Sequence, residues 1–465
     1  MKFKLVALFC FAYTIVVAQD SLIFKKGDRV CFVGNSITRN GEFYKNILLY
    51  YITRFPQMPI TFFNCGISGD ACNQVLNRMD SDILINQPTH AIIMLGMNDV
   101  YRSLYGSIPT SNSDTLQKRK DAILTYTTRL DSIVKIFREK NIKVILQKPT
   151  IYDETAKTNE PNHLGVNKAL KYCGDSVVGL LANKYRLPVI DYWSILNNKN
   201  IELQKKDSTA SIIGRDRIHP GSSGHLVIAY QFLKATNAPG YVADIVVKKD
   251  LKTSNNSCRH CSISAYKITS DTIIFTVQEN SLPFPIKANQ QLALQLVPFI
   301  NELSAEKLKV EVKDTANNIS YKLFIDTTLI GTFSKDDLAT GILLTRYENT
   351  PQYQASKKVS MILDTIWNMI TDLRTMAFIR FNYLKDYKGN MRDSTQIIKY
   401  LDSLFEARNI PKNDFILHEY SRYKTFIFSK EQLEKQVEDK LKFAYSVASI
   451  APRKHVFKLV NEKHL

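Results

Sequence analysis

The chain has 465 residues, of which 45% are hydrophobic, 11% aromatic and 23% charged. This length suits two or three domains, and the composition excludes an intrinsically disordered chain because it supplies ample apolar material for a core. The net charge of +18 is spread out without a polybasic block. Charge alone would permit binding to nucleic acid, acidic polysaccharide or a membrane surface. No nucleic-acid-binding motif accompanies it, so we predict a basic soluble surface and no nucleic-acid partner.

The first eighteen residues differ from the rest of the chain. A basic start, MKFK, precedes the uncharged apolar run LVALFCFAYTIVVA, and small residues at 16–18 come before Gln19. This pattern is typical of a secretory signal peptide. It predicts a leader at 1–18 and export to the periplasm or the extracellular space. An uncleaved membrane anchor is the alternative, although the run is short for a span. No later segment is long and apolar enough to cross a membrane, so we expect no stable membrane insertion after leader removal.

Residues 28–240 alternate short apolar segments with segments of helical periodicity. The expected strands are VCFV (30–33), ITFFN (60–64), AIIML (91–95), VILQ (144–147) and PVID (188–191). Apolar residues repeat at helical spacing between them, at 44–51, 115–140 and 163–186. Strands separated by such helices predict a parallel sheet covered on both faces. We therefore predict an α/β domain over 19–240, a flavodoxin-like three-layer sandwich with a five-stranded parallel sheet.

The pattern changes near residues 237–244. The chain then becomes rich in β-branched alternation, with strands expected at 271–278 and 307–314 and two strands around a turn at Asp326 and Thr327 within 321–334. From about 354 the apolar residues return to helical spacing, and further helical stretches lie at 395–408 and 430–449. We predict a β-rich appendage at 241–345 and a helical C-terminal region at 346–465.

Six cysteines remain if the leader is removed: Cys31, Cys65, Cys72, Cys173, Cys258 and Cys261. An exported protein could oxidise some of them, and the pair in SCRHCS is the best placed to close locally. Free thiols are the alternative. A zinc site would need two more clustered ligands beside the two cysteines of this pair, and His260 alone does not supply them, so we expect no metal.

In parallel α/β sheets ligands bind beyond the carboxyl ends of the strands, and the first motif there is GNSIT, Gly34 to Thr38. Gly34 permits a sharp exit from the strand. Ser36 then sits at a turn just before a helix. Taken alone, a serine in this position is more often a helix cap than a nucleophile.

Two further motifs come after the next two strands. NCGISGD ends the second strand, and its Gly69 allows backbone N–H groups to approach a ligand closely. LGMND ends the third strand, and the amide of Asn98 could donate to a developing negative charge. An ordinary turn and an asparagine that supports its own loop are the alternatives. We expect Asp70 and Asp99 to brace these loops rather than to act as acids.

The fourth motif is DRIHP, in which Asp216 and His219 are three residues apart. A carboxylate and an imidazole at this spacing can meet within one turn, so Asp216 could hold the ring in one tautomer while its other nitrogen faces outward. Ser36 would attack an acyl carbon, and His219 would take its proton and pass it to the leaving alcohol. The N–H of Ser36, the N–H of Gly69 and the amide of Asn98 would hold the oxyanion.

With all four motifs in order, the chain resembles the SGNH/GDSL hydrolase family, whose name lists the four residues that fall here on Ser36, Gly69, Asn98 and His219. The match covers about 28–240. The resemblance implies the flavodoxin-like fold, a Ser-His-Asp mechanism and no metal or organic cofactor. One departure is that the family commonly has Gly-Asp-Ser where this chain has Gly-Asn-Ser. Asn35 keeps an acceptor and drops the charge.

The family's substrates are broad, and a secreted member with extra regions resembles bacterial carbohydrate esterases that remove acetyl groups from glycans. GTFSKDDLATGI and TPQYQASKKV in the C-terminal half resemble, more loosely, appendages of such hydrolases. We therefore expect an exported carbohydrate O-acetyl esterase. The alternatives are a lipase, lysophospholipase or thioesterase with the same site, and a catalytically silent glycan-binding protein on the same fold. The sequence singles out no substrate-binding residue, although Tyr101 and Arg102 could line a pocket.

Overall fold

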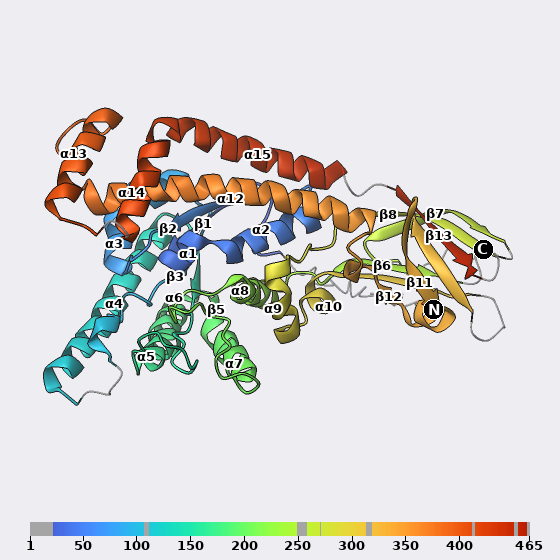
Figure 1. The fold of residues 1–465 in the computed structure, drawn as a ribbon, viewed down its shortest axis with the longest axis horizontal. Coiled ribbons are helices and arrows are strands. Elements are labelled where there is room, and N and C mark those ends of the chain that lie inside the picture. Colours follow the sequence, from blue (N-terminus) through green and yellow to red (C-terminus); the bar gives the residue numbers. More distant parts are fainter. Residues whose placement is uncertain are drawn as a thin grey trace, which may run out of the picture.

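The computed structural model describes residues 22–106, 111–248, 258–269, 271–312, 319–411, 414–450 and 454–462. The expected signal peptide at 1–18 lies outside these residues. Figure 1 shows an elongated molecule with an α/β body at one end and a β-rich body at the other. Two long helices, α12 (Pro351–Tyr383) and α15 (Lys430–Ile450), run side by side along the α/β body.

A five-stranded parallel sheet organises the first half of the chain, with the order β2-β1-β3-β4-β5. The strands are β1 (Arg29–Gly34), β2 (Thr61–Gly66), β3 (His90–Met94), β4 (Lys143–Gln147) and β5 (Val189–Ile190). Each overlaps a strand predicted from the sequence. This order is the flavodoxin-like one, so the predicted fold class is confirmed.

Helices cover both faces of this sheet, because successive residues of a buried strand point to opposite sides. Val30 and Phe32 of β1 join an apolar cluster with α2, α7 and α8, whereas Cys31 and Val33 join a second cluster with α3, α4, α5 and α6. The helices of this body are α1 (Ser36–Asn40), α2 (Glu42–Arg54), α3 (Cys72–Asn77), α4 (Ser113–Glu139), α5 (Val166–Tyr172), α6 (Gly179–Tyr185), α7 (Tyr192–Gln204) and α8 (Ser222–Ala235).

The helix predicted at 163–186 is divided in the structure. A π-helical turn, Cys173–Val178, joins α5 to α6. Gly174 in this turn packs directly on Lys148, since a Cβ at that position would lie 3.0 Å from the lysine Cδ.

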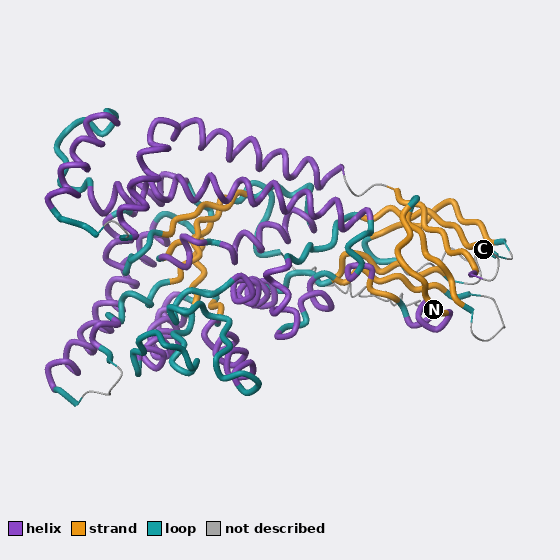
Figure 2. The backbone as a smooth tube through the Cα atoms, in the orientation of Figure 1, coloured by secondary structure: helices purple, strands orange, loops and turns teal. Residues whose placement is uncertain are grey.

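The β-rich body contains two further sheets, visible as the orange strands at one end of Figure 2. Their orders are β12-β9-β6 and β11-β10-β13-β8-β7. The expected turn at Asp326 joins two paired strands, and Asp326 has a left-handed backbone with φ 55°. The strands are β6 (Tyr241–Val247), β7 (Cys261–Ile268), β8 (Thr272–Glu279), β9 (Ala305–Val310), β10 (Ser320–Ile325), β11 (Thr328–Ser334) and β12 (Ile342–Leu343). Short helices α9 (Gln291–Leu296), α10 (Phe299–Leu303) and α11 (Lys335–Thr340) connect them.

The C-terminal region consists of α12, α13 (Ser394–Ala407), α14 (Phe415–Phe426) and α15. The sequence predicts a helical C-terminal region over 346–465 with its last helical stretch at 430–449, but residues 454–461 within that region form β13 (Lys454–Asn461), which pairs with β8 and β10. The reason is a two-residue period: His455, Phe457 and Leu459 are buried while the residues between them are exposed. No helix among the described residues is long and apolar enough to cross a membrane.

Candidate active site

Ser36 is the first residue of α1, directly after β1. A Cβ on Gly34 would lie 2.7 Å from the carbonyl oxygen of Met94 on β3, so the strand end requires glycine. Asn35 Oδ1 accepts a hydrogen bond from the backbone N–H of Ile37 at 3.1 Å and caps the helix. An uncharged amide oxygen is sufficient for this role. The cap is therefore Asn35, which leaves the hydroxyl of Ser36 available for another partner.

That partner is His219, from the loop before α8. Ser36 Oγ lies 2.6 Å from His219 Nε2. His219 Nδ1 forms a short hydrogen bond with Asp216 Oδ2. Asp216 Oδ1 accepts from the backbone N–H groups of Ile218 and His219, each at 3.0 Å. The carboxylate is thus held by its own loop, and the imidazole lies between it and the serine.

The charge state of Asp216 suits this arrangement. Burial raises the pKa of Asp216, but the hydrogen bonds from the His219 ring and from the two backbone N–H groups outweigh this and hold the pKa well below its usual range. The carboxylate is therefore ionised at neutral pH and can stabilise a positive charge on the neighbouring ring.

Arg217, between these residues, anchors the loop and was missed by the sequence analysis. Its backbone is left-handed, with φ 66°, a conformation that is unfavourable for a side chain of this size. The buried guanidinium donates to the carbonyl oxygens of Asp153 at 2.9 Å and Ala156 at 3.0 Å. These bonds tie the loop of Asp216 and His219 to the segment after β4.

The two other motifs end at the same edge of the sheet. Gly69 has φ 86°, and a Cβ there would have no atom within 4 Å. Glycine is therefore favoured at this position by the backbone angle and not by steric crowding. Asn98 donates one side-chain N–H to the carbonyl oxygen of Asp70 at 2.9 Å, which fixes the amide and leaves its second N–H. Within the described parts of the chain, the backbone N–H groups of Ser36 and Gly69 have no acceptor.

Asp70 and Asp99 brace these loops. Asp99 accepts from the backbone N–H groups of Cys72 at 2.8 Å and Gly96 at 2.9 Å. Asp70 pairs with Arg78 at 2.7 Å, and burial nevertheless raises the pKa of Asp70 to about 6. Both carboxylates therefore have structural partners.

Three further side chains, His225, Tyr101 and Trp367, lie in environments that differ from one another. His225 is buried in a stack on Phe43, and burial lowers its pKa to about 3. Tyr101, three residues after Asn98, is 52% exposed with a left-handed backbone. Trp367 is buried and donates to the carbonyl oxygen of Asn40 at 3.2 Å.

The six cysteines among the described residues are free thiols. Cys31, Cys65, Cys72 and Cys173 are buried, and Cys258 and Cys261 are partly buried. Among the residues that the structure describes, no group of three or more His, Cys, Asp or Glu side chains could hold a metal ion.

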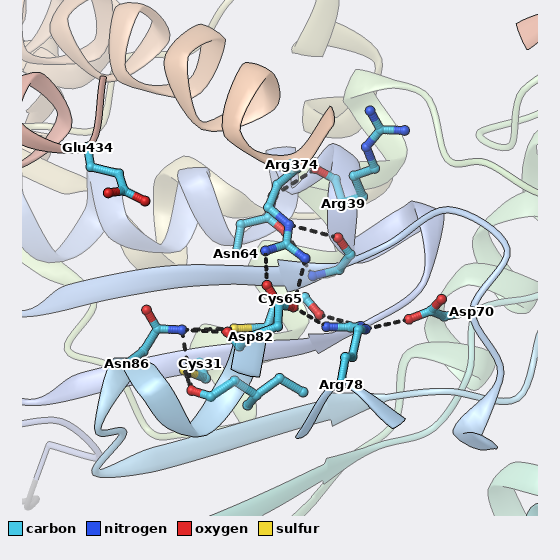
Figure 3. A network of polar contacts seen from close by, with 12 residues as sticks. Cys31, Arg39, Asn64, Cys65, Asp70, Arg78, Asp82, Asn86, Arg374 and Glu434 are labelled. Atoms are coloured by element: carbon cyan, nitrogen blue, oxygen red, sulfur yellow. Dashed lines mark hydrogen bonds and ion pairs between the residues drawn. The ribbon is translucent and has the colours of Figure 1, made fainter. Parts of the chain in front are cut away.

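The sequence analysis also missed a network of buried charges beneath the loop after β2. Figure 3 shows Arg39, Arg78, Asp82 and Arg374 in this network. No local motif marks these residues, because Arg374 lies on α12, far along the chain.

Known proteins with similar sequences or structures point to one family. Residues 30–232 match the family GDSL-like Lipase/Acylhydrolase. An acetylxylan esterase from Geobacillus stearothermophilus is 25% identical over 224 residues, which cover 45% of this chain and 93% of that protein. The structure of a gut microbial diltiazem-metabolizing enzyme is 29% identical, covers 95% of this chain and 99% of that one, and has a TM-score of 0.84. Residues 30–232 therefore form a domain of the SGNH, or GDSL-like, hydrolases, and this domain makes the protein a carboxylic ester hydrolase.

Proposed function

We propose that the protein is an exported serine esterase that removes O-acyl groups, above all O-acetyl groups, from carbohydrate. The observation that carries the mechanism is the 2.6 Å contact between Ser36 Oγ and His219 Nε2, with Asp216 bonded to the other ring nitrogen. A carbohydrate substrate is supported by the similarity to an acetylxylan esterase. Export is supported by the leader pattern at 1–18.

In the first half of the reaction, Ser36 attacks the ester carbon while His219 accepts the hydroxyl proton. The imidazolium that forms is stabilised by Asp216, which stays ionised because of its lowered pKa. His219 then gives the proton to the leaving sugar hydroxyl, and the acyl group stays on Ser36. In the second half, water attacks the acyl-enzyme with His219 again as the base, which releases the acid and restores the serine.

Both tetrahedral intermediates carry a negative oxygen that needs donors. We assign this role to the backbone N–H groups of Ser36 and Gly69 and the free amide N–H of Asn98. Each donor of this kind contributes roughly 3–4 kcal/mol of transition-state stabilisation. The bond from Asn98 to the Asp70 carbonyl orients the amide in advance, so little reorganisation is needed during the reaction.

The test is acetate release by the purified mature protein and its Ser36→Ala variant. The panel contains acetylated xylan and other acetylated polysaccharides, diltiazem, which bears an acetyl ester, and short- and long-chain p-nitrophenyl esters. We expect wild type to release acetate from carbohydrate and Ser36→Ala to be slower by about 10⁴-fold or more. A preference for long acyl chains would favour a lipase. Silence on every ester with folded protein would favour a glycan-binding role.

Variants of the other two residues separate their roles. His219→Ala should be as inactive as Ser36→Ala, because it removes the base that contacts the serine hydroxyl. Asp216→Ala should retain more activity, since the ring is also positioned by its own loop. Equal activity of Asp216→Ala and wild type would contradict the assignment of the carboxylate.

A further inference from the structure

The loop at the end of β2, residues 66–70, which carries Gly69, contacts the C-terminal helices. We propose that Arg374 on α12 and Glu419 on α14 are positioning residues that hold this loop and α1 in the geometry of the oxyanion hole. This inference rests on the proposed roles of Ser36, Gly69 and Asn98. The structure supports it through three independent sets of contacts.

The first set is a chain of buried ion pairs from Arg374 to Asp70 (Figure 3). Arg374 Nε donates to the carbonyl oxygen of Gly66 at 3.1 Å, and its two terminal nitrogens pair with Asp82 at 2.7 and 2.9 Å. Asp82 also pairs with Arg78, whose Nε bonds Asp70 at 2.7 Å. Arg374 therefore contacts the start of the loop directly and its end, at Asp70, through two intermediates.

At Asp70, this series of ion pairs contacts the proposed oxyanion donors. The carbonyl oxygen of Asp70 accepts the side-chain N–H of Asn98, and Asp70 directly follows Gly69. A shift of Asp70 would move both donors together. The central carboxylate of the network is ionised at neutral pH: burial raises the pKa of Asp82, but its pairs with Arg374 and Arg78 outweigh this and lower the pKa to about 2.

The second set of contacts joins α14 to the helix that begins with Ser36. Arg39, in the same short α1, is buried and pairs with Glu419. It also donates to Thr375 on α12 at 3.0 Å and to Ser68 in the loop at 3.1 Å. Arg39 thus links both C-terminal helices to α1 and to the residue before Gly69.

The third contact is apolar. Ile67, in the loop, has no exposed surface and packs in the core of the C-terminal helices. Its partners in that cluster include Met376, Ile379, Leu401 and Tyr420. The loop is therefore held against the C-terminal helices both by polar contacts and by apolar packing.

Positioning of this kind has a kinetic signature. Oxyanion donors act mainly in the transition state, so their displacement lowers kcat with little effect on KM. A misplacement of about 1 Å can reduce the rate by about 100-fold. A merely structural role would lower thermal stability without changing the kcat of the folded enzyme.

The experiment compares Arg374→Met, Arg374→Lys and Glu419→Gln with Arg380→Met, a control on an exposed arginine of the same helix. On a p-nitrophenyl acetate assay we expect Arg374→Met to lose about 10–100-fold in kcat with KM within about threefold. We expect Arg374→Lys to recover part of this loss and Arg380→Met to match wild type. Glu419→Gln keeps the shape of the side chain and removes its charge. It tests the same inference if Arg374→Met does not fold.

Hydrogen exchange supplies a readout that does not depend on turnover. We expect faster exchange in the peptide covering residues 64–71 of Arg374→Met and Glu419→Gln, with β1 and β3 unchanged. Unchanged kcat in folded variants would overturn the inference while leaving the esterase assignment intact. A wild-type protein inactive on all esters would overturn both, and unchanged exchange at 64–71 would show that the helices do not hold the loop.

Discussion

The β-rich body and the C-terminal helices join the α/β body in different ways. The β-rich body has an apolar core of its own, which includes Phe275, Leu323 and Leu459 and no residue of the first 240. Helices α12 and α15 instead complete a core of the α/β body, through residues such as Leu363, Ile366 and Ala448. Half of the chain thus lies beyond the family domain. The helices α12 and α15 and the segment with α9 and α10 are continuous with the core of that domain, whereas the strands of the β-rich body have a core of their own.

This difference shows that the boundary of a family match is not the boundary of a folding unit. The match ends at residue 232, whereas the core that supports its sheet draws on residues beyond 350. The solved structure that is 29% identical covers 95% of this chain, so the helices and the β-rich body form one architecture with the α/β body in that protein too.

The largest expected effect comes from placing a charge in each of the two cores. Ile366→Asp buries an unpaired carboxylate against the sheet of the α/β body, so we expect no folded esterase. Leu323→Asp places the same group in the β-rich core, and we expect the esterase rate to survive. For each variant, we would measure the soluble yield, the thermal unfolding by circular dichroism and the esterase rate. Equal loss in the two variants would mean that the two regions fold as one unit.

A smaller effect concerns the charged contact between α12 and the α/β body. The pKa of Asp70 is raised to about 6, whereas an aspartate in an unfolded chain titrates near about 4. Between these values the folded state binds more protons than the unfolded state, so stability should fall as the pH rises. We expect this group to contribute a loss of about 2–3 kcal/mol between pH 4 and 6 in wild type, absent in Asp70→Asn.

Denaturant titrations of wild type and Asp70→Asn at several pH values measure this difference. Only the change with pH is informative, because the substitution also weakens the pair with Arg78. Parallel curves for the two proteins would contradict the raised pKa.

The hydroxyl of Tyr445 joins α15 to the backbone of Ile60 in the α/β body. Tyr445 Oη accepts from the backbone N–H of Ile60 at 3.0 Å and donates to its carbonyl oxygen at 3.2 Å. Tyr445→Phe leaves both buried groups without this partner, so we expect a loss of about 1–2 kcal/mol in the free energy of unfolding. Tyr241→Phe, at an exposed position in the β-rich body, is the control and should change little.

The smallest effect is expected on the outer face of the same helix. Lys442 and Glu438 form an ion pair at 2.7 Å, with both side chains 68% exposed. Water and salt screen such pairs. We expect Lys442→Ala to leave the melting temperature unchanged, and a clear decrease would show that the outer face of α15 also has a partner.

Local sequence patterns were enough to predict the strands, their parallel direction and the place of the site. A buried parallel strand is a short apolar run, and the residues after it must lie at one edge of the sheet. Ser36, Gly69 and Asn98 could therefore be assigned to one edge from the sequence alone, and His219 was added from its spacing to Asp216 and from the resemblance to the family. Residues 454–461 lie in the region predicted to be helical but form β13, because their alternation of buried and exposed side chains fits a strand in a sheet.

The contacts that hold that site in place became visible only in the tertiary structure. Arg374 and Gly66 are 308 residues apart in the sequence. The helical period of α12 does not indicate that Arg374 contacts Gly66, and the motif NCGISGD does not indicate that an arginine binds its carbonyl oxygen. Local periods specify which face of an element is buried, but not which distant element covers it. That choice depends on the path of the chain through the β-rich body and back, so the contacts of Arg374, Glu419 and Ile67 form only when α12 and α14 pack against the loop and α1.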